Sequence, residues 1–268
     1  MPDRSRGHRG RPARTPAQDQ AAGLRRLFAP SEPQWLPILL GPERDLDNAG
    51  WLANLARACV GQGARTLLVD AARANVARAF GVRARYDLAH ALDGDCAPRE
   101  ACAQAGANLR ILPAARALDD DGRSPERLRR FEAGVRALAA TADCALLVLP
   151  APRGRSLAGF CAGGVSDAIV VAGPEAGCER RLLGTMRSLL SVADIDTFRL
   201  LFQGTDPECA GRLYSRLAAS GARELGARTS DAGSVHDVSA IERLVRLVRC
   251  RSMPRCDRAG DTAVETVS

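Results

Sequence analysis

The chain has 268 residues, of which 46% are hydrophobic and 26% charged, and its formal net charge is +7 at pH 7. This length and apolar share suit one large core or two small ones, and they exclude a disordered protein. The sequence contains no lysine, so its 38 basic residues are all arginine. Schiff-base chemistry and the standard P-loop both need a lysine amine and are therefore excluded.

Basic residues gather at the two ends of the chain. Residues 1–16 hold five arginines and one aspartate, and this composition predicts a disordered basic arm. Residues 242–258 hold six arginines and two carboxylates, and 251–268 is expected to be a polar tail. The body between them is nearly neutral, which argues against nucleic acid as a partner. An arginine-rich nucleic-acid-binding module stays as a second alternative.

The first periodic segment is 17–28, whose apolar residues fall on one edge of a short helix. A proline-rich stretch, 29–35, is predicted to be a linker. Apolar strand-like runs follow at 36–40, 65–70, 109–113, 143–150, 167–173 and 198–204. Amphipathic helix patterns lie between several of them, at 49–60, 125–140, 176–193 and 207–220.

Strands that are apolar throughout and alternate with helices indicate a parallel sheet covered on both faces. The sequence therefore predicts one α/β domain over 36–250, a doubly wound and mostly parallel sheet. Its last helix, 239–249, carries one apolar stripe made of Ile241, Leu244, Val245 and Val248. Because the other face is basic, these four residues are either packed on the sheet or laid on an anionic membrane surface.

The segment after the first strand resembles a known family. Ala53-Asn54-Leu55-Ala56, and then 63–70 (GARTLLVD), are similar to the first helix and second strand of the deviant Walker-A ATPases of the MinD/ParA group. The resemblance implies a P-loop NTPase-like fold of the SIMIBI type. In the intact family this loop binds ATP and magnesium.

The phosphate-binding loop of that family is replaced in this chain. Aligned on the helix motif, the signature lysine falls on Glu43, the phosphate-binding lysine on Asn48 and the magnesium-binding threonine on Ala49. The loop also carries Asp45 and Asp47. At ~4 Å and an effective dielectric of about 20, each carboxylate repels a phosphate charge by about 4 kcal/mol. A helix dipole supplies only about 0.3–1 kcal/mol of attraction.

Three further family positions are altered. The family's paired aspartates after the second strand become Asp70-Ala71-Ala72, the Walker-B aspartate falls on Val148, and the adenine-reading asparagine falls on Gln203. We therefore expect a pseudo-ATPase with no catalytic residue, no bound cofactor and no metal. The alternative is a divergent but active ATPase that positions another cellular structure, with Arg44 in place of the lysines.

The helix at 17–28 contains Asp19-Gln20-Ala21-Ala22-Gly23-Leu24-Arg25, which resembles the DQAxxLR motif of the flagellar number regulators FlhG/FleN. In that branch the motif binds and activates FlhF, a signal-recognition-type GTPase. The resemblance implies that Gln20 acts on the GTPase site and that Leu24 and Arg25 dock the helix. A helix that merely closes the edge of the sheet is the other interpretation.

Cysteine and histidine offer no further site. The nine cysteines form no C-x-x-C pair, and His8, His90 and His236 are scattered without an evident nucleophile. Reduced thiols, and the absence of an apolar segment behind the basic N-terminus, predict a cytoplasmic protein. The resemblance to the flagellar regulators also allows a peripheral location at the inner membrane or at the cell pole.

Overall fold

The computed structural model describes residues 32–41, 47–119, 124–151, 160, 167–175, 177–192 and 195–252. The chain divides into two units, Met1–Ser31 and Glu32–Ser268, and the described residues all belong to the second. The expected basic arm 1–16 and partner-binding helix 17–28 lie outside the described residues. So do Glu43, Arg44 and Asp45 of the first loop, and 253–268 of the expected tail.

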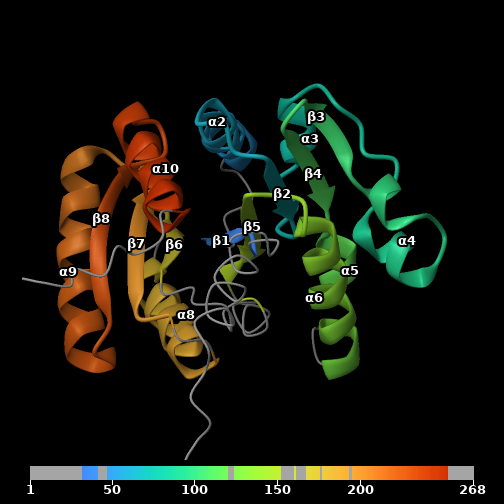
Figure 1. The fold of residues 1–268 in the computed structure, drawn as a ribbon. Helices are drawn as coiled ribbons and strands as arrows, with labels where there is room; N and C mark the ends of the chain where they lie inside the picture. The colour runs from blue at the N-terminus through green and yellow to red at the C-terminus, as the bar shows by residue number, and fades with distance from the viewer. Residues whose placement is uncertain are drawn as a thin grey trace, which may run out of the picture. The chain divides into compact units, whose positions relative to one another are not determined.

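The described residues form one sheet. Its strands are β1 (Gln34–Leu40), β2 (Thr66–Asp70), β3 (Ala103–Gly106), β4 (Leu109–Pro113), β5 (Cys144–Pro150), β6 (Asp167–Ala172), β7 (Thr197–Phe202) and β8 (Arg228–Ser234). They lie side by side in the order β3-β4-β2-β5-β1-β6-β7-β8 (Figure 1). Every pairing is parallel except that of β3 with β4. The predicted doubly wound, mostly parallel α/β fold is confirmed.

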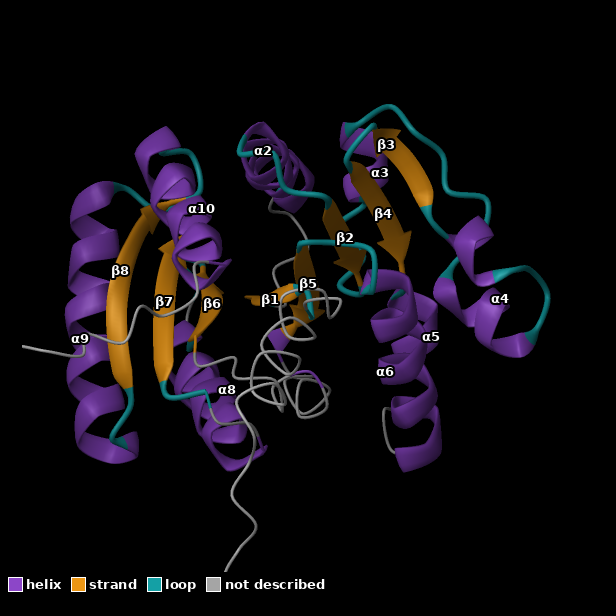
Figure 2. Ribbon diagram, viewed as in Figure 1, coloured by secondary structure: helices purple, strands orange, loops and turns teal. Residues whose placement is uncertain are grey.

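Helices cover both faces of this sheet (Figure 2). They are α2 (Asn48–Gly61), α3 (Val76–Ala79), α4 (Leu88–Asp93), α5 (Ala115–Asp119), α6 (Pro125–Ala139), α8 (Cys178–Val192), α9 (Pro207–Leu225) and α10 (Val238–Ser252), with a 3-10 turn η1 (Pro98–Ala101). Side-chain caps start several of them: Asp47 accepts from Gly50, Ser124 from Arg127 and Asp206 from Cys209. Each cap satisfies one of the free amides of a first helical turn.

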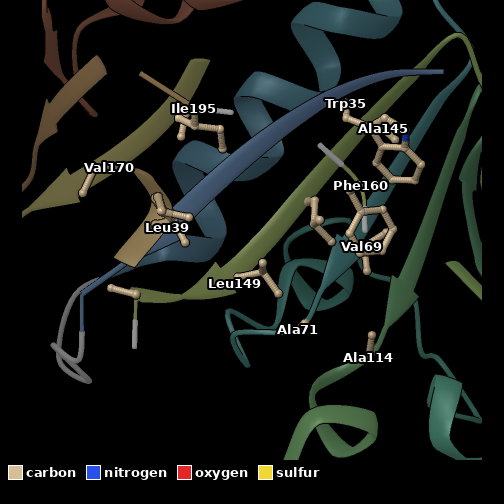
Figure 3. Packing of buried hydrophobic residues seen from close by; sticks show 14 of the residues in the cluster. Trp35, Leu39, Val69, Ala71, Ala114, Ala145, Leu149, Phe160, Val170 and Ile195 are labelled. Atoms are coloured by element: carbon tan, nitrogen blue, oxygen red, sulfur yellow. The ribbon is translucent and has the colours of Figure 1, made fainter. Parts of the chain in front are cut away.

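Two apolar clusters fill the space between the sheet and its helices. One packs α4, α6, α8 and α9 against the sheet, and the other packs α2, α3 and α10 against the opposite face. Figure 3 shows part of the first cluster, where the rings of Trp35 and Phe160 lie 4.8 Å apart. Each central strand contributes residues to both clusters, which explains why these strands are apolar along their whole length.

The six expected strands are all present, with ends that differ from the predicted ones by at most two residues, and two strands were missed. Gln34 and Trp35 were assigned to the linker but belong to β1, because burial of the Trp35 ring to 4% exposure draws this end of the strand into the sheet. The missed strands β3 and β8 are the two edges of the sheet. Edge strands are short or polar because they are half-covered, and their sequences, AQAG and RTSDAGS, show no apolar run.

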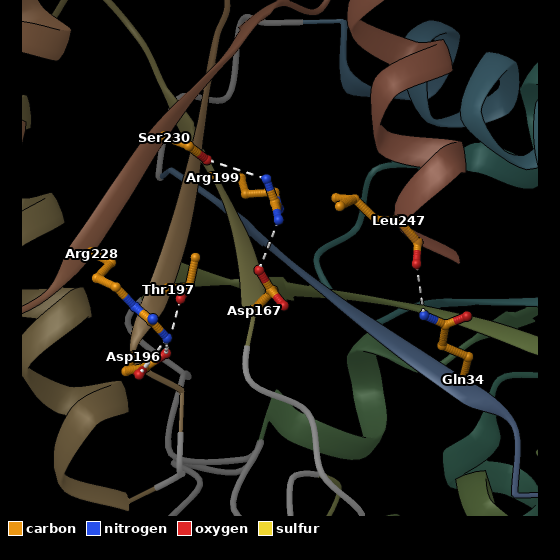
Figure 4. Close-up of polar contacts among 8 residues, drawn as sticks. All are labelled: Gln34, Asp167, Asp196, Thr197, Arg199, Arg228, Ser230 and Leu247. Atoms are coloured by element: carbon orange, nitrogen blue, oxygen red, sulfur yellow. Dashed lines mark hydrogen bonds and ion pairs between the residues drawn. The ribbon is translucent and has the colours of Figure 1, made fainter. Parts of the chain in front are cut away.

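The last helix is docked on the sheet. Ile241, Leu244, Val245 and Val248 are between 1% and 8% exposed and belong to the cluster formed with α2. The Gln34 side chain also donates from Nε2 to the carbonyl of Leu247 at 3.1 Å (Figure 4). In this structure the stripe packs in the core, so contact of these four side chains with a membrane stays a prediction that requires the helix to leave the sheet.

The helix α10 is also longer than predicted. It extends to Ser252, so the first two residues of the expected polar tail are helical. No helix of the described part of the chain combines the length and the apolar character that a membrane span requires.

An ion pair explains the arginine inside β7. Arg199 lies in a strand flanked on both sides, and its guanidinium reaches Asp167 on β6 at 3.0 Å and Ser230 on β8 at 3.3 Å (Figure 4). The three side chains form a polar row across neighbouring strands. Pairing of this kind offsets the cost of placing a charge on a half-buried surface.

Candidate functional site

The candidate site lies at the edge of the sheet where the parallel strands end. In open α/β sheets, ligands bind outside the carboxyl ends of the strands, next to the first strand-to-helix turn. Here β1 ends at Leu40 and α2 begins at Asn48, with Asp47 as its cap. The structure describes four of the predicted positions at or near this end of the strands: Asn48, Ala49, Asp70 and Gln203. Val148 lies inside the strand β5.

The first turn of α2 is closed by its own side chains. The carboxylate of Asp47 accepts a hydrogen bond from the amide of Gly50 at 3.2 Å, and Asn48 Oδ1 accepts from Trp51 Nε1 at 3.1 Å. A side chain at position 50 would bring its Cβ within 3.0 Å of Asp47 Oδ2, so glycine permits this close approach. The cap places negative charge at the helix N-terminus, where a phosphate would bind, and the side chain of Ala49 offers no oxygen for a cation.

Asp70 is turned toward its own loop. It is only 6% exposed, and its carboxylate accepts from the amides of Ala74 at 2.9 Å and Val76 at 3.3 Å. Arg73 and Asn75 adopt positive φ angles of 59° and 57°, which wraps the backbone around the carboxylate. Burial raises the pKa of Asp70, although the hydrogen bonds from these amides oppose the shift. This aspartate therefore anchors the loop between β2 and α3.

Val148 occupies the middle of the sheet. It is fully buried, with Ile38 on β1 and Asp70 on β2 as its neighbours in register. The side chain of a valine has no atom that could hold a magnesium ion or its waters. Among the described residues, no cluster of three or more histidine, cysteine, aspartate or glutamate side chains could bind a metal.

Gln203 joins two distant segments. It is 2% exposed, and its Nε2 donates to the carbonyl of Asp47 at 3.1 Å across 156 residues of sequence. This bond ties the end of β7 to the start of α2. Its Oε1 is buried and has no hydrogen-bond partner in the described structure. That oxygen is a polar feature of this edge that a bound group could satisfy.

Taken together, the described residues fit ATP and magnesium poorly. The capping carboxylate of Asp47 opposes phosphate, Asn48 accepts a hydrogen bond from Trp51, and the side chain of Val148 has no atom that ligates a metal. Only the orphan oxygen of Gln203 suits a base. No step of ATP chemistry can therefore be derived from these side chains.

The structure gives Asp47, Asp70 and Gln203 hydrogen-bond partners that the sequence did not predict. The signal for the wrapped loop was Asp70 followed by 71–75 (AARAN), because asparagine tolerates positive φ. No pattern in the sequence predicts the hydrogen bond between Gln203 and Asp47. The expected partner-binding residues Asp19, Gln20, Leu24 and Arg25 lie outside the described residues.

The strand order and the two helical layers define a doubly wound protein with the fold of the MinD/ParA-type P-loop NTPases. The septum site-determining protein MinD of Pyrococcus horikoshii, complexed with Mg-ADP, matches with a TM-score of 0.53 and 18% identity, over 82% of this chain and 96% of that one. A ParA family ATPase from Chlorobium tepidum matches with a TM-score of 0.52 and 12% identity, over 81% and 90% of the two chains.

A cobyrinic acid a,c-diamide synthase from Mycobacterium smegmatis also matches, with a TM-score of 0.58 and 16% identity over 81% of this chain and 95% of that one. No protein-family model and no curated protein sequence matches the chain. Because the neighbours are under 25% identical and differ in activity, the likeness establishes the fold alone.

Proposed function

We propose that this chain is a regulatory protein that works through protein–protein contacts, without binding or hydrolysing ATP. The observation that carries the proposal is that the carboxylates of the site bind the protein's own backbone: Asp47 caps α2, and Asp70 accepts hydrogen bonds from the amides of its own loop. A nucleotide would have to displace these hydrogen bonds and bring phosphate against carboxylates.

Electrostatics support the same conclusion. The loop carries Glu43, Asp45 and Asp47 against Arg44, and the chain has no lysine to neutralise a triphosphate. At about 4 kcal/mol for each close carboxylate–phosphate pair in an effective dielectric of about 20, two such contacts outweigh a helix dipole of about 0.3–1 kcal/mol.

We further propose that the partner is a GTPase of the FlhF type, and that the protein regulates flagellar number or placement. The support is the DQAxxLR-like segment of Asp19, Gln20, Leu24 and Arg25, which precedes a MinD-like domain by a short linker. In this proposal Gln20 reaches the GTPase site while Leu24 and Arg25 hold the helix in place. Since no nucleotide biases the α/β domain, activation is constitutive.

The test is GTP hydrolysis by an FlhF-type partner, measured with and without the full chain. The proposal predicts stimulation by the parent protein and its loss in Gln20→Ala. Gln18→Ala is the matched control, because it removes the same side chain two positions earlier and should stimulate like the parent. Equal stimulation by all three proteins would discard the role given to Gln20, and no stimulation at all would discard the partner.

The second candidate function is a divergent ATPase, and the orphan oxygen of Gln203 favours it, because this position reads adenine in the resembling family. In that case Arg44 replaces the lysines. Micromolar ATP binding that is lost in Arg44→Ala would select this function over the first.

A further inference from the structure

A second concave site lies at the other end of the parallel strands, where β2 and β4 begin. It is a cavity of about 430 Å³, bounded by the starts of β2 and β4, the hairpin of β3 and β4, and the end of α6. Its polar lining includes Arg65, Arg99, Gln104, Asn108, Arg110 and Thr141. The remaining wall is made of small or aliphatic residues. All these elements belong to the continuous stretch 47–119 or to 124–151, which the structure describes in full.

The charge in this cavity is unbalanced. Three arginines line it, and the described residues of its wall include no carboxylate. Arg65 is neutralised from outside the wall, because Asp143 accepts from its Nη2 at 2.6 Å and its Nε at 3.0 Å. Arg99 has no hydrogen-bond or ion-pair partner for its side chain among the described residues. Two positive charges, those of Arg99 and Arg110, are left without a counter-ion.

Arg110 is held in place by contacts that leave part of its guanidinium unused. Its Nη2 donates at 2.9 Å to the carbonyl of Leu138, at the end of α6, and at 2.9 Å to Thr141 Oγ1. Capping the helix in this way offsets the negative end of the α6 dipole, which would otherwise repel an anion. A purely structural cap explains these two bonds, but it does not explain the exposed Arg99 or the donors of Gln104 and Asn108 around it.

We propose that this cavity binds a small anion that carries phosphoryl groups, of about the size of a diphosphate or a short phosphorylated metabolite. Planar guanidinium groups donate paired hydrogen bonds that match phosphate oxygens. The volume lies within the range of small-molecule sites, ~300–1,000 Å³. A nucleic acid backbone is instead bound by a long row of many cations, and the two arginines of this half-open hollow that lack a counter-ion do not form such a row.

The proposed anion site is independent of the proposed regulatory function. It is built at the amino ends of β2 and β4, whereas the site of Asp47 and Asp70 lies at the carboxyl ends of the parallel strands. Variants in one can therefore be tested without disturbing the other.

The experiment is isothermal titration of the full chain with pyrophosphate, without magnesium and at low salt. The critical variant is Arg99→Gln, since this exposed side chain makes no contact on which folding depends. Arg223→Gln is the matched control, because Arg223 is 71% exposed on α9 and lies outside the cavity. The parent and the control should bind one pyrophosphate with a dissociation constant of about 1 mM or tighter.

Arg99→Gln should weaken that binding at least about tenfold, because it removes a charge-assisted contact. Equal affinity in the parent and Arg99→Gln would overturn the proposal, as would the absence of saturable binding in the parent. It would also be overturned by a short single-stranded oligonucleotide that binds in an Arg99-dependent way while pyrophosphate does not, since the surface would then serve a polymer.

Discussion

Replacing the buried aspartate at the end of β2 tests the account of the candidate site. The carboxylate of Asp70 accepts hydrogen bonds from the amides of Ala74 and Val76. In Asp70→Ala, water can reach the half-buried amide of Ala74, but the amide of Val76 is buried and loses its acceptor. The loop with Arg73 and Asn75 at positive φ then loses its anchor.

The expected loss of stability can be estimated from these contacts. A hydrogen bond to a charged group contributes about 1.5–3 kcal/mol, and a buried amide without a partner costs about 1–3 kcal/mol. Removing the buried carboxylate also relieves its desolvation, which burial imposes on the parent. The net loss should be about 3 kcal/mol, which corresponds to a fall in Tm of about 6–12 °C for a domain of this size.

The assay is thermal and urea unfolding of Asp70→Ala, with Asp93→Ala as the control, because Asp93 is an exposed carboxylate on α4. The control should change stability by less than about 0.5 kcal/mol. A Tm of Asp70→Ala equal to that of the parent would refute the anchoring role.

The stability difference between the parent and Asp70→Asn, measured as a function of pH, tests the direction of the pKa shift. The folded-state pKa of Asp70 is raised above its ordinary value, chiefly by burial. Its contribution to stability is therefore fully present below the ordinary pKa and is lost as the pH rises through the raised value. The stability difference between the parent and Asp70→Asn should shrink as the pH rises through that window. A difference that grows with pH would contradict the assigned shift.

Two further predictions concern Val148 and α10. Val148→Asp, which introduces the acidic residue of the resembling family, should cost more than about 4 kcal/mol of unfolding free energy, because it buries a charge beside Asp70, whereas Val148→Ala should cost about 2 kcal/mol. Calorimetric unfolding with added Mg²⁺ checks this, and protection of the aspartate variant by Mg²⁺ would show a working metal site. Leu244→Asp should lower the unfolding free energy by about 3–5 kcal/mol, since Leu244 is 1% exposed, while Val238→Asp, at a residue 72% exposed, should change it by less than about 0.5 kcal/mol. If Leu244→Asp left stability intact and abolished binding to anionic vesicles, the docked position of α10 would be wrong.

The central sheet was predictable because its physical cause is local. A parallel strand covered on both faces must be apolar at successive positions, and runs such as 109–113 and 143–150 carry that signature. The edge strands β3 and β8 were not predicted, because they lack such an apolar run. Only part of their surface is buried, so their sequences resemble loops.

The details of both sites depend on contacts between distant segments, which no local pattern encodes. Gln203 reaches Asp47 across 156 residues, and the basic cavity gathers Arg65, Arg99 and Arg110 from separate elements. The apolar stripe on α10 was visible in the sequence, but its periodicity is the same for a helix on a sheet and a helix on a membrane. The cluster with α2 decides between these for the described structure.

The central claim is the proposal that the loop after β1 does not bind a nucleotide. Titration of the full chain with ATP and magnesium tests it most directly. The titration uses the Arg99→Gln variant, so that binding of ATP to the arginine-lined cavity contributes no heat. The account predicts no saturable heat at ATP concentrations up to about 1 mM. A dissociation constant in the micromolar range, abolished by Arg44→Ala, would contradict it.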